Sequence, residues 1–404
     1  MSALVTPGNL RSALAVTRSL GRRRVQVTIA DEGLGSLAGA SRYCQRTVRV
    51  PSPARSAEAF VSAIRDEVGR GKHRVVIPAD DVTLSVISQA RAQFDGVATL
   101  PFPDFETIQM AHDKSALAAL ASEKGIPIPK TIVMRDPADL ESAIRHVGLP
   151  AVVKAHVSRF QLGGQWRDGG PVRYVHTASE LDEALRAVQE IVPCPLVQEH
   201  IPGEGRGIFV LMNRGRLRAA FAHRRIREKP PSGGVSVLSE SVVLDPQLLE
   251  HAERILEALK WHGVAMLEFK RDARDGVTKL LEINGRFWGS LQLAVDSGVD
   301  FPYLLYRLAV DGDIEPAFTY QVGVRLRWWL GDLDWLLLRL REKCSLARRL
   351  GAIPEFLTPA GRMTKHEVYR RDDPGPALAE CSQYVGAAFR SAIARLSGRP
   401  RTHA

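Results

Sequence analysis

The 404-residue chain is poor in cysteine, and the few cysteines it has are scattered. None forms a CxxC pair or has a second cysteine at metal-ligand spacing: Cys44, Cys194, Cys344 and Cys381. This scarcity argues against a cysteine-based metal site. We therefore expect reduced thiols that mostly serve as packing residues, and a cytoplasmic protein.

The sequence also lacks a basic leader and a long apolar run. The N-terminal "MSALVTPGNLRSALAV" has no basic region and soon reaches Pro-Gly, so we expect no signal peptide. The most apolar later stretch, "RWWLGDLDWLLLRLRE", is broken by Asp332, Asp334 and several arginines, which argues against a membrane span. We expect this segment to pack on the protein, with contact to a membrane surface or a partner as the alternative.

Basic residues exceed acidic ones without forming one cluster. The formal net charge is +10 and the pI is near 9.6, while 45% hydrophobic and 25% charged residues are typical of a globular protein. A soluble arginine-rich surface explains the excess, as would an anionic partner such as a nucleotide, nucleic acid or lipid. Because no RNA-binding or basic-aromatic motif is present, no nucleic-acid partner is expected.

Residues 1–105 alternate strand-like and helical patterns. "ALVT", "RVQVTIA" and "RVVIPAD" are strand-like, and helical patterns separate them. Such alternation predicts an α/β unit with a doubly wound parallel sheet. The first turn, "TPGNLRS", lacks GxGxxG, which weakens an NAD-binding interpretation. The proline-punctuated "TLPFPDFE" at 99–106 is expected to link this unit to the next.

The chemistry is concentrated in "HGVAMLEFKRDARDGVTKLLEINGRF", residues 262–287. Two apolar runs flank Asp275-Gly276, a strong hairpin signal. Folding the chain about residue 275 places Glu268 opposite Glu282, and directly opposed residues share one face of a sheet. Asn284 and Arg286 follow on that face at the period of a strand. The alternative is a solvated strand face with ordinary charges.

Two carboxylates held together in a half-buried site repel each other and favour a shared proton or cation. Adding the amide oxygen of Asn284 gives an all-oxygen ligand set, which suits Mg²⁺ or Mn²⁺ better than zinc. Arg286 is expected to act as a fixed bidentate clamp for an anion. Further upstream, Lys154 lies in the apolar "AVVK", where a lysine either reaches for solvent or pairs with an anion.

Glu268 followed by Glu282-x-Asn284-x-Arg286 resembles the metal-binding hairpin of the ATP-grasp superfamily. The usual form there is E-x-N-P-R, and this chain has Gly285 in place of the proline. The similarity extends to "HDK" at 112–114, to "AVVKAHVS" and to "LVQEHIPGEG" at 196–205, and it covers about 106–312. More narrowly, "AHRRIREKPPSGGVSVLSES" and "EINGRFWGSLQLAVDSGVDFPYLL" resemble a bacterial group of predicted ATP-dependent carboxylate-amine ligases related to the carbamoyl-phosphate synthase large chain.

The resemblance implies a fold and a set of site residues. A pre-ATP-grasp domain (1–105) would precede a two-lobed α+β ATP-grasp domain (106–315; small lobe about 115–200, central lobe about 201–315) and a mainly helical extension (316–404). The implied metal ligands are Glu268, Glu282 and Asn284. The implied catalytic residues are Arg286, Arg224 and Arg225, although neighbours on a strand face opposite sides. The implied ATP-binding residues are Lys114, Lys154, Gly163, Gly164, Glu199, His200, Ile201, Glu204 and Arg206.

The resemblance further implies an ADP-forming ligase with ATP and Mg²⁺ (or Mn²⁺) as cofactors. It would activate a small-molecule carboxylate as an acyl phosphate and join it to an amine. A carboxylase or carbamoyl-phosphate-synthase-like reaction through bicarbonate and carboxyphosphate is the alternative, and a non-catalytic ATP sensor is a further one. Small-molecule substrates are the expected partners, a homodimer is compatible with the sequence, and membrane contact is not expected.

Overall fold

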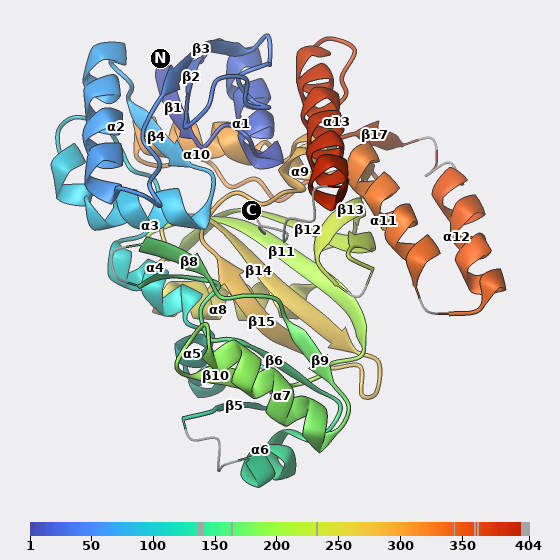
Figure 1. Ribbon diagram of the computed structural model, residues 1–404. Coiled ribbons are helices and arrows are strands. Elements are labelled where there is room, and N and C mark those ends of the chain that lie inside the picture. The colour runs from blue at the N-terminus through green and yellow to red at the C-terminus, as the bar shows by residue number, and fades with distance from the viewer. Residues whose placement is uncertain are drawn as a thin grey trace.

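The computed structural model describes residues 1–135, 140–162, 165–231, 233–342, 344–358, 361 and 363–396, without the side chains of 162, 165 and 391–396. The N-terminal unit is a four-stranded parallel sheet of order β3-β2-β1-β4 (β1 Ser2–Thr6, β2 Gln26–Asp31, β3 Cys44–Arg49, β4 Val75–Pro78). Helix α1 (Arg11–Arg22) covers one face, and α2 (Ala57–Gly71) and α3 (Asp81–Gln89) cover the other. The predicted doubly wound parallel sheet is confirmed (Figure 1).

A small antiparallel sheet of order β5-β10-β6-β9 forms the next layer (β5 Thr131–Val133, β6 Ala151–Ala155, β9 Arg173–Val175, β10 Pro195–Glu199). Helices α6 (Leu140–Val147) and α7 (Ala178–Gln189) pack on it through a shared apolar cluster. Helix α7 begins with a capping-box arrangement, in which Glu180 N donates to Thr177 Oγ1 at 3.2 Å and Glu180 Oε2 accepts from His176 N at 2.7 Å. A separate hairpin, β7 (Arg159–Leu162) and β8 (Gln165–Asp168), rises from this lobe toward the N-terminal unit (Figure 1).

The largest sheet has seven strands in the order β15-β14-β11-β12-β13-β16-β17. Their bounds are β11 Gly203–Asn213, β12 Arg216–Lys229, β13 Val235–Ser241, β14 Gly263–Asp272, β15 Thr278–Asn284, β16 Arg325–Arg327 and β17 Thr364–His366. One face packs on α5 (Lys114–Glu123) and α8 (Pro246–Ala258). The other packs on α9 (Leu291–Ser297), α10 (Phe301–Asp311) and α1, so a single apolar cluster joins the central sheet to the N-terminal unit. Helix α4 (Phe105–His112) connects the two units.

The segment after residue 315 is mainly helical, with α11 (Trp329–Arg341), α12 (Leu346–Leu357) and α13 (Gly375–Leu396), and it also supplies β16 and β17 to the central sheet. Two buried aspartates fasten it through ion pairs. Asp332, fully buried, accepts from Arg227 at 2.5 Å and from Arg327 at 2.6 Å. Asp373 pairs with Arg18 of α1 at 2.8 Å, and both side chains are 1% exposed.

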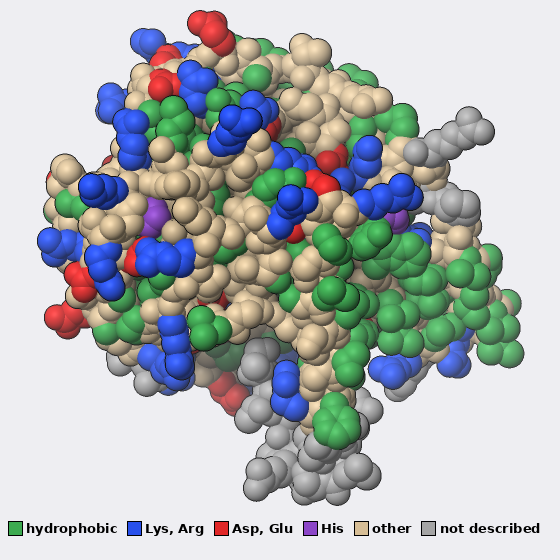
Figure 2. Space-filling view, turned by 90° about the horizontal axis from the view of Figure 1, so that it is seen from above, with side chains coloured by type: hydrophobic (Ala, Val, Ile, Leu, Met, Phe, Trp, Pro, Cys, Tyr) green, Lys and Arg blue, Asp and Glu red, His purple; other side chains and the backbone are tan. Residues whose placement is uncertain are grey.

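The outer surface differs from one region to another. In the view from above, Lys and Arg side chains are scattered, whereas hydrophobic side chains gather on the side where α11 and α12 lie (Figure 2). Leu346, Leu350 and Leu357 of α12 are exposed there. Among the described residues, no helix combines the length and apolar character needed to cross a bilayer.

Candidate ATP and metal site

The hairpin β14–β15 places the predicted carboxylates face to face. Glu268 is paired directly with Glu282, and Met266 with Asn284, in the antiparallel register. Gly276 takes a φ of +75° in the connecting turn, a conformation that glycine adopts without strain. A bulge between Glu268 and Phe269 shifts the register toward the turn, where Phe269 pairs with Leu280. The predicted pairing of Glu268 with Glu282 is therefore confirmed, whereas the bulge was not predicted.

The two glutamates have different electrostatic surroundings. Burial raises the pKa of Glu268, and the charge of Glu282 adds to this, although Arg225 Nη2 donates to Glu268 Oε1 at 2.5 Å. Burial acts on Glu282 in the same direction, but Lys114, whose Nζ lies 3.8 Å away, holds its pKa below the ordinary value. A divalent cation would relieve the repulsion between these carboxylates.

The donor set fits a magnesium or manganese ion. Asn284 Nδ2 donates to Glu282 Oε1 at 3.1 Å, so the amide and the carboxylate lie side by side. In the described part of the chain, no three His, Cys, Asp or Glu side chains cluster as metal ligands, so the site rests on two carboxylates and one amide. Mg²⁺ sites commonly use one or two carboxylates and complete their shell with water and phosphate oxygens.

Two lysines from different elements approach the carboxylates. Lys114 begins α5 directly after its N-cap Asp113, and its Nζ donates to Ser158 Oγ at 2.8 Å. Lys154, on β6, donates to Gln198 Oε1 at 2.9 Å. Burial and the positive charge of Lys114 lower the pKa of Lys154 to about 8, against the opposing effect of the glutamates. The two lysines thus place positive charge beside the carboxylates, with Lys114 Nζ 3.8 Å from Glu282 Oε2, as suits a polyphosphate held together with a cation.

Arg286 has a partner that the sequence did not indicate. Its Nε and Nη2 donate to the two carboxylate oxygens of Asp81, each at 3.1 Å. Nη2 also donates to Asn284 Oδ1 at 3.3 Å, and Nη1 to the carbonyl of Phe287 at 3.2 Å. Asp81 therefore occupies the fork that Arg286 was expected to offer to a bound anion.

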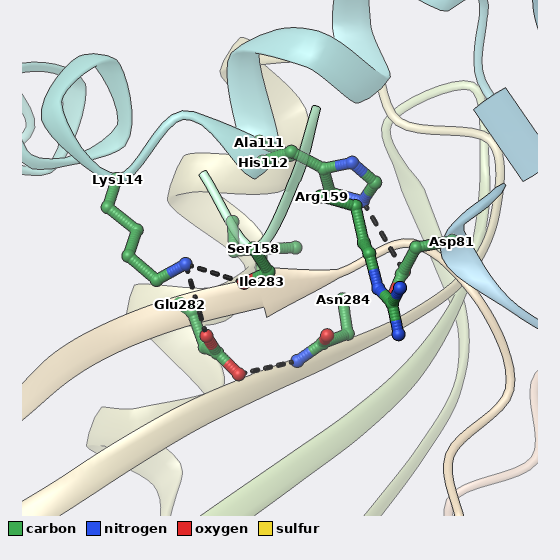
Figure 3. Close-up of a pocket in the computed structure, with 9 residues that line it drawn as sticks. All are labelled: Asp81, Ala111, His112, Lys114, Ser158, Arg159, Glu282, Ile283 and Asn284. Atoms are coloured by element: carbon green, nitrogen blue, oxygen red, sulfur yellow. Dashed lines mark hydrogen bonds and ion pairs between the residues drawn. The ribbon is translucent and has the colours of Figure 1, made fainter. Parts of the chain in front are cut away.

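A pocket opens between these groups. Its walls come from α3, the end of α4, the start of α5, the beginning of the hairpin β7–β8, and β15: Asp81, Ala111, His112, Lys114, Ser158, Arg159, Glu282, Ile283 and Asn284. In Figure 3, Lys114 and Asn284 both reach toward Glu282. Four of its polar residues were not expected there from the sequence: Asp81, His112, Ser158 and Arg159. Asp81 could have been found, because it follows a parallel strand and ligands bind at the carboxyl ends of such strands.

The two arginines predicted beside the site separate as their alternation requires. Arg225 faces the carboxylates and donates to both Glu268 and Glu228, at 2.5 and 2.9 Å. Arg224 faces the opposite way and donates to Glu240 at 2.6 and 2.9 Å. Arg224 therefore does not join the group of residues around Glu268, because neighbouring positions of a strand point to opposite faces.

The predicted ATP-binding residues between positions 199 and 206 lie where the small sheet passes into the large one. Glu199 ends β10, where its carboxylate accepts from Arg274 at 2.5 Å, and Ile201 is buried. The ring of His200 meets the edge of Tyr174 with a centroid separation of 5.6 Å. Glu204 and Arg206 pair with each other at 3.3 Å on β11. The predicted ATP-binding residues Gly163 and Gly164 lie outside the described residues.

Comparisons with known proteins agree with this geometry. Residues 192–330 match the family described as "ATP-grasp in the biosynthetic pathway with Ter operon". The chain is 23% identical over 279 residues to the D-aspartate ligase of Enterococcus faecium, covering 65% of each chain. It is 26% identical over 247 residues to the N5-carboxyaminoimidazole ribonucleotide synthase of Pseudomonas aeruginosa, covering 59% of this chain and 65% of that protein. The matches thus span slightly less than two thirds of these two relatives.

Solved structures show the same fold. A biotin carboxylase from Campylobacter jejuni superposes with a TM-score of 0.65 at 16% identity, over 80% of this chain and 74% of that one. An L-amino acid ligase from Bacillus licheniformis gives a TM-score of 0.61 at 19% identity, over 78% and 74% of the two chains. Together with the family match and the curated relatives, this fold places the chain in the ATP-grasp superfamily.

Proposed function

We propose that this protein is an ADP-forming ligase that activates a carboxylate with MgATP and joins it to an amine. The observation that carries the proposal is the meeting of Glu268, Glu282 and Asn284 with Lys114 and Lys154. Oxygen ligands for a hard cation and positive charge for phosphates are the two requirements of a nucleotide triphosphate site. The names of the relatives, D-aspartate ligase and L-amino acid ligase, support a carboxylate and an amine as the substrate classes.

The metal would be held by Glu268, Glu282 and Asn284. When bound, Mg²⁺ would neutralise the negative charge of the phosphates. Because the carboxylates face each other across one hairpin, the backbone already fixes their relative position before any cation arrives. Mn²⁺ is compatible with the same oxygen set.

The chain's own residues would bind and orient the reactants. Lys114 and Lys154 would hold phosphate oxygens, and the segment 199–206 would hold the adenosine end. In the first step a carboxylate oxygen attacks the terminal phosphorus and ADP leaves. In the second step the amine nitrogen attacks the acyl carbon, phosphate leaves, and the nitrogen loses a proton. Arg225 and Arg286 would balance negative charge as it moves, so positioning and electrostatics supply the catalysis.

A hydroxylamine assay tests this function before the natural amine is identified. Purified protein is mixed with MgATP, hydroxylamine and a panel of amino acids and small acids, and both ADP and hydroxamate are measured. We expect an acid that gives both products in equal amounts, because hydroxylamine traps an acyl phosphate. The Glu282→Gln variant should lose both, whereas Glu58→Gln, at an exposed position on α2, serves as the matched control. MgATP binding without ADP release for any acid and amine would refute the ligase proposal.

A carboxyphosphate reaction is the second candidate, and specific comparisons favour it. Solved neighbours include biotin carboxylase domains, one of them in complex with MgADP and bicarbonate. The matched synthase of Pseudomonas aeruginosa is also named for a carboxyamino product. Bicarbonate-dependent ADP release, in bicarbonate-depleted buffer with and without added bicarbonate, separates the two candidates. ADP release that requires an organic acid and does not change with bicarbonate supports the ligase.

We also propose that the protein works in the cytoplasm on small molecules. All four cysteines are free, and Cys381 is exposed. An exposed thiol without a partner fits a reducing compartment. Location by fractionation of the source cells would test this directly.

A further inference from the structure

A carboxylate from the N-terminal unit reaches into the candidate site. Asp81 is the first residue of α3, which follows strand β4 after a short turn, and the preceding Asp80 caps that helix by accepting from Thr83 N at 2.7 Å. The carboxylate of Asp81 meets Arg286 in a fork-to-fork geometry, with two contacts of 3.1 Å. The two side chains are 23% and 24% exposed, and 205 positions separate them in the sequence.

We propose that Asp81 is a positioning residue, which holds the guanidinium of Arg286 in one orientation for the terminal phosphate of the nucleotide. The inference rests on the proposed function, because it takes the phosphate end of the site to lie beside Glu282. It assigns the N-terminal unit a direct part in the chemistry. Asp81 acts through Arg286 and need not touch the substrate.

The hydrogen-bond count of Arg286 supports this role. A guanidinium has five N–H groups in a fixed plane. Contacts with described residues use four of them: two on Asp81, one on Asn284 and one on Phe287. One N–H of Nη1 remains for a substrate oxygen, in a direction set by the other four. Such preorganisation removes the cost of ordering a long side chain when the anion arrives.

Asp81 is itself held in place and charged. Burial raises the pKa of its carboxyl, but Arg286 and His112 outweigh this and hold the pKa below the ordinary value. His112 Nε2 lies 3.6 Å from Asp81 Oδ1, the oxygen that also accepts from Arg286 Nε. The Asp81 carboxylate therefore stays ionised at neutral pH, and an asparagine in its place would remove one of the two charge-assisted contacts with Arg286.

The same geometry allows a rival explanation with the opposite prediction. Asp81 would then be a stand-in that fills the arginine fork only until a substrate anion displaces it. Removing the carboxylate would free the fork and strengthen anion binding. A positioning residue behaves in the reverse way, because without it Arg286 loses its orientation and anion binding weakens. The sign of the change therefore decides between the two.

Titration calorimetry of the Asp81→Asn variant tests the inference with two defined probes. MgADP is titrated first, and inorganic phosphate is then titrated into the MgADP complex. We expect the MgADP affinity to stay within about twofold and the phosphate affinity to fall about tenfold, as expected for losing one oriented charge-assisted contact. Asp313→Asn is the matched control, since it breaks a bidentate pair with Arg218 (2.6 and 2.6 Å) far from the site.

The calorimetry results distinguish a failure of the positioning role from a failure of the proposed function. Absence of MgADP binding by the wild type would sink the nucleotide site itself. MgADP binding with unchanged or tighter phosphate binding in Asp81→Asn would overturn the positioning role. Failure of the wild-type MgADP complex to take up phosphate would also overturn it, because Arg286 would then have no anion to orient. Thermal unfolding of both variants shows whether the fold is intact.

Discussion

The charge on Lys154 predicts how nucleotide affinity changes with pH. Burial, together with the neighbouring charge of Lys114, lowers the pKa of Lys154 to about 8. Only the ammonium form attracts phosphate, and its share falls from about nine tenths at pH 7 to about one tenth at pH 9. If MgADP binds only when Lys154 is protonated, the apparent Kd for MgADP should rise about tenfold between pH 7 and pH 9, because a smaller share of the protein is then ready to bind. The change is a loss of affinity with rising pH, because the lysine is charged below its pKa.

Calorimetric titration of MgADP at several pH values between 7 and 9, with excess Mg²⁺, measures this slope. Titrations in two buffers of different ionisation enthalpy should also show proton uptake near pH 9. The Lys154→Met variant should bind weakly with no slope. Lys114→Met should keep the slope but shift it to higher pH, because the charge that lowers the pKa of Lys154 is gone. A flat wild-type profile, or a slope that persists in Lys154→Met, would refute the reasoning; Lys365→Met, at an exposed position, is the control.

Three further changes test other parts of the site and its support. Glu282→Gln should lower Mg²⁺-dependent ADP release about 100-fold or more, since metal charge stabilisation is worth several kcal/mol, and full turnover would contradict the metal assignment. Gly285→Pro should cost about 1–3 kcal/mol in urea unfolding, because a Cβ there would lie 3.0 Å from the ring of Trp261; unchanged stability would show that the ring can yield. Burial raises the pKa of Glu367 to about 7, so the folded protein holds a proton on Glu367 that the unfolded chain releases at lower pH. The free energy of unfolding should therefore fall as the pH rises from about 5 to 8. The Glu367→Gln variant should not show this fall, so over this pH range its unfolding free energy should increase relative to that of the wild type by up to about 3 kcal/mol. A difference between the two proteins that stays constant with pH would contradict this prediction.

The sequence predicted best those parts of the site that depend on local geometry. Glu268 and Glu282 were paired correctly because Asp275-Gly276 marks a tight turn, and a turn fixes which residues of a hairpin oppose each other. The alternation of Arg224 and Arg225 followed from the period of a strand in the same way. The bulge after Glu268 left this pairing intact, because it lies on the turn side of the carboxylates.

Contacts between distant segments could not be predicted. Asp81 and Arg286 meet only because the N-terminal unit packs on the central sheet, and neither residue signals the other in the sequence. The same holds for Lys154 and Gln198, which share a sheet through pairing of β6 with β10. The strand β16 was also missed, since three residues, Arg325–Arg327, are too few and too charged to show a strand pattern.

Packing between distant residues explains why this chain has Gly285 where the motif usually has proline. The sequence showed only that glycine replaces the usual proline of the motif. In the structure the buried Trp261 lies against the position where a side chain would project, and its Nε1 donates to the carbonyl of Val264 at 3.1 Å. The glycine therefore accommodates the tryptophan, and the two residues are expected to vary together.

The buried pair Arg18–Asp373 has a consequence for the cooperativity of unfolding. Arg18 also donates to the carbonyls of Glu367 and Val368, so the final segment of the chain completes the interior of the first unit. A fragment that ends near residue 315 would leave Arg18 and Arg227 as cations without their aspartates, and breaking a buried pair in this way costs about 3–5 kcal/mol each. The three regions distinguished along the sequence should therefore melt together in one transition, and none should be obtained as a stable protein by cutting the chain between them.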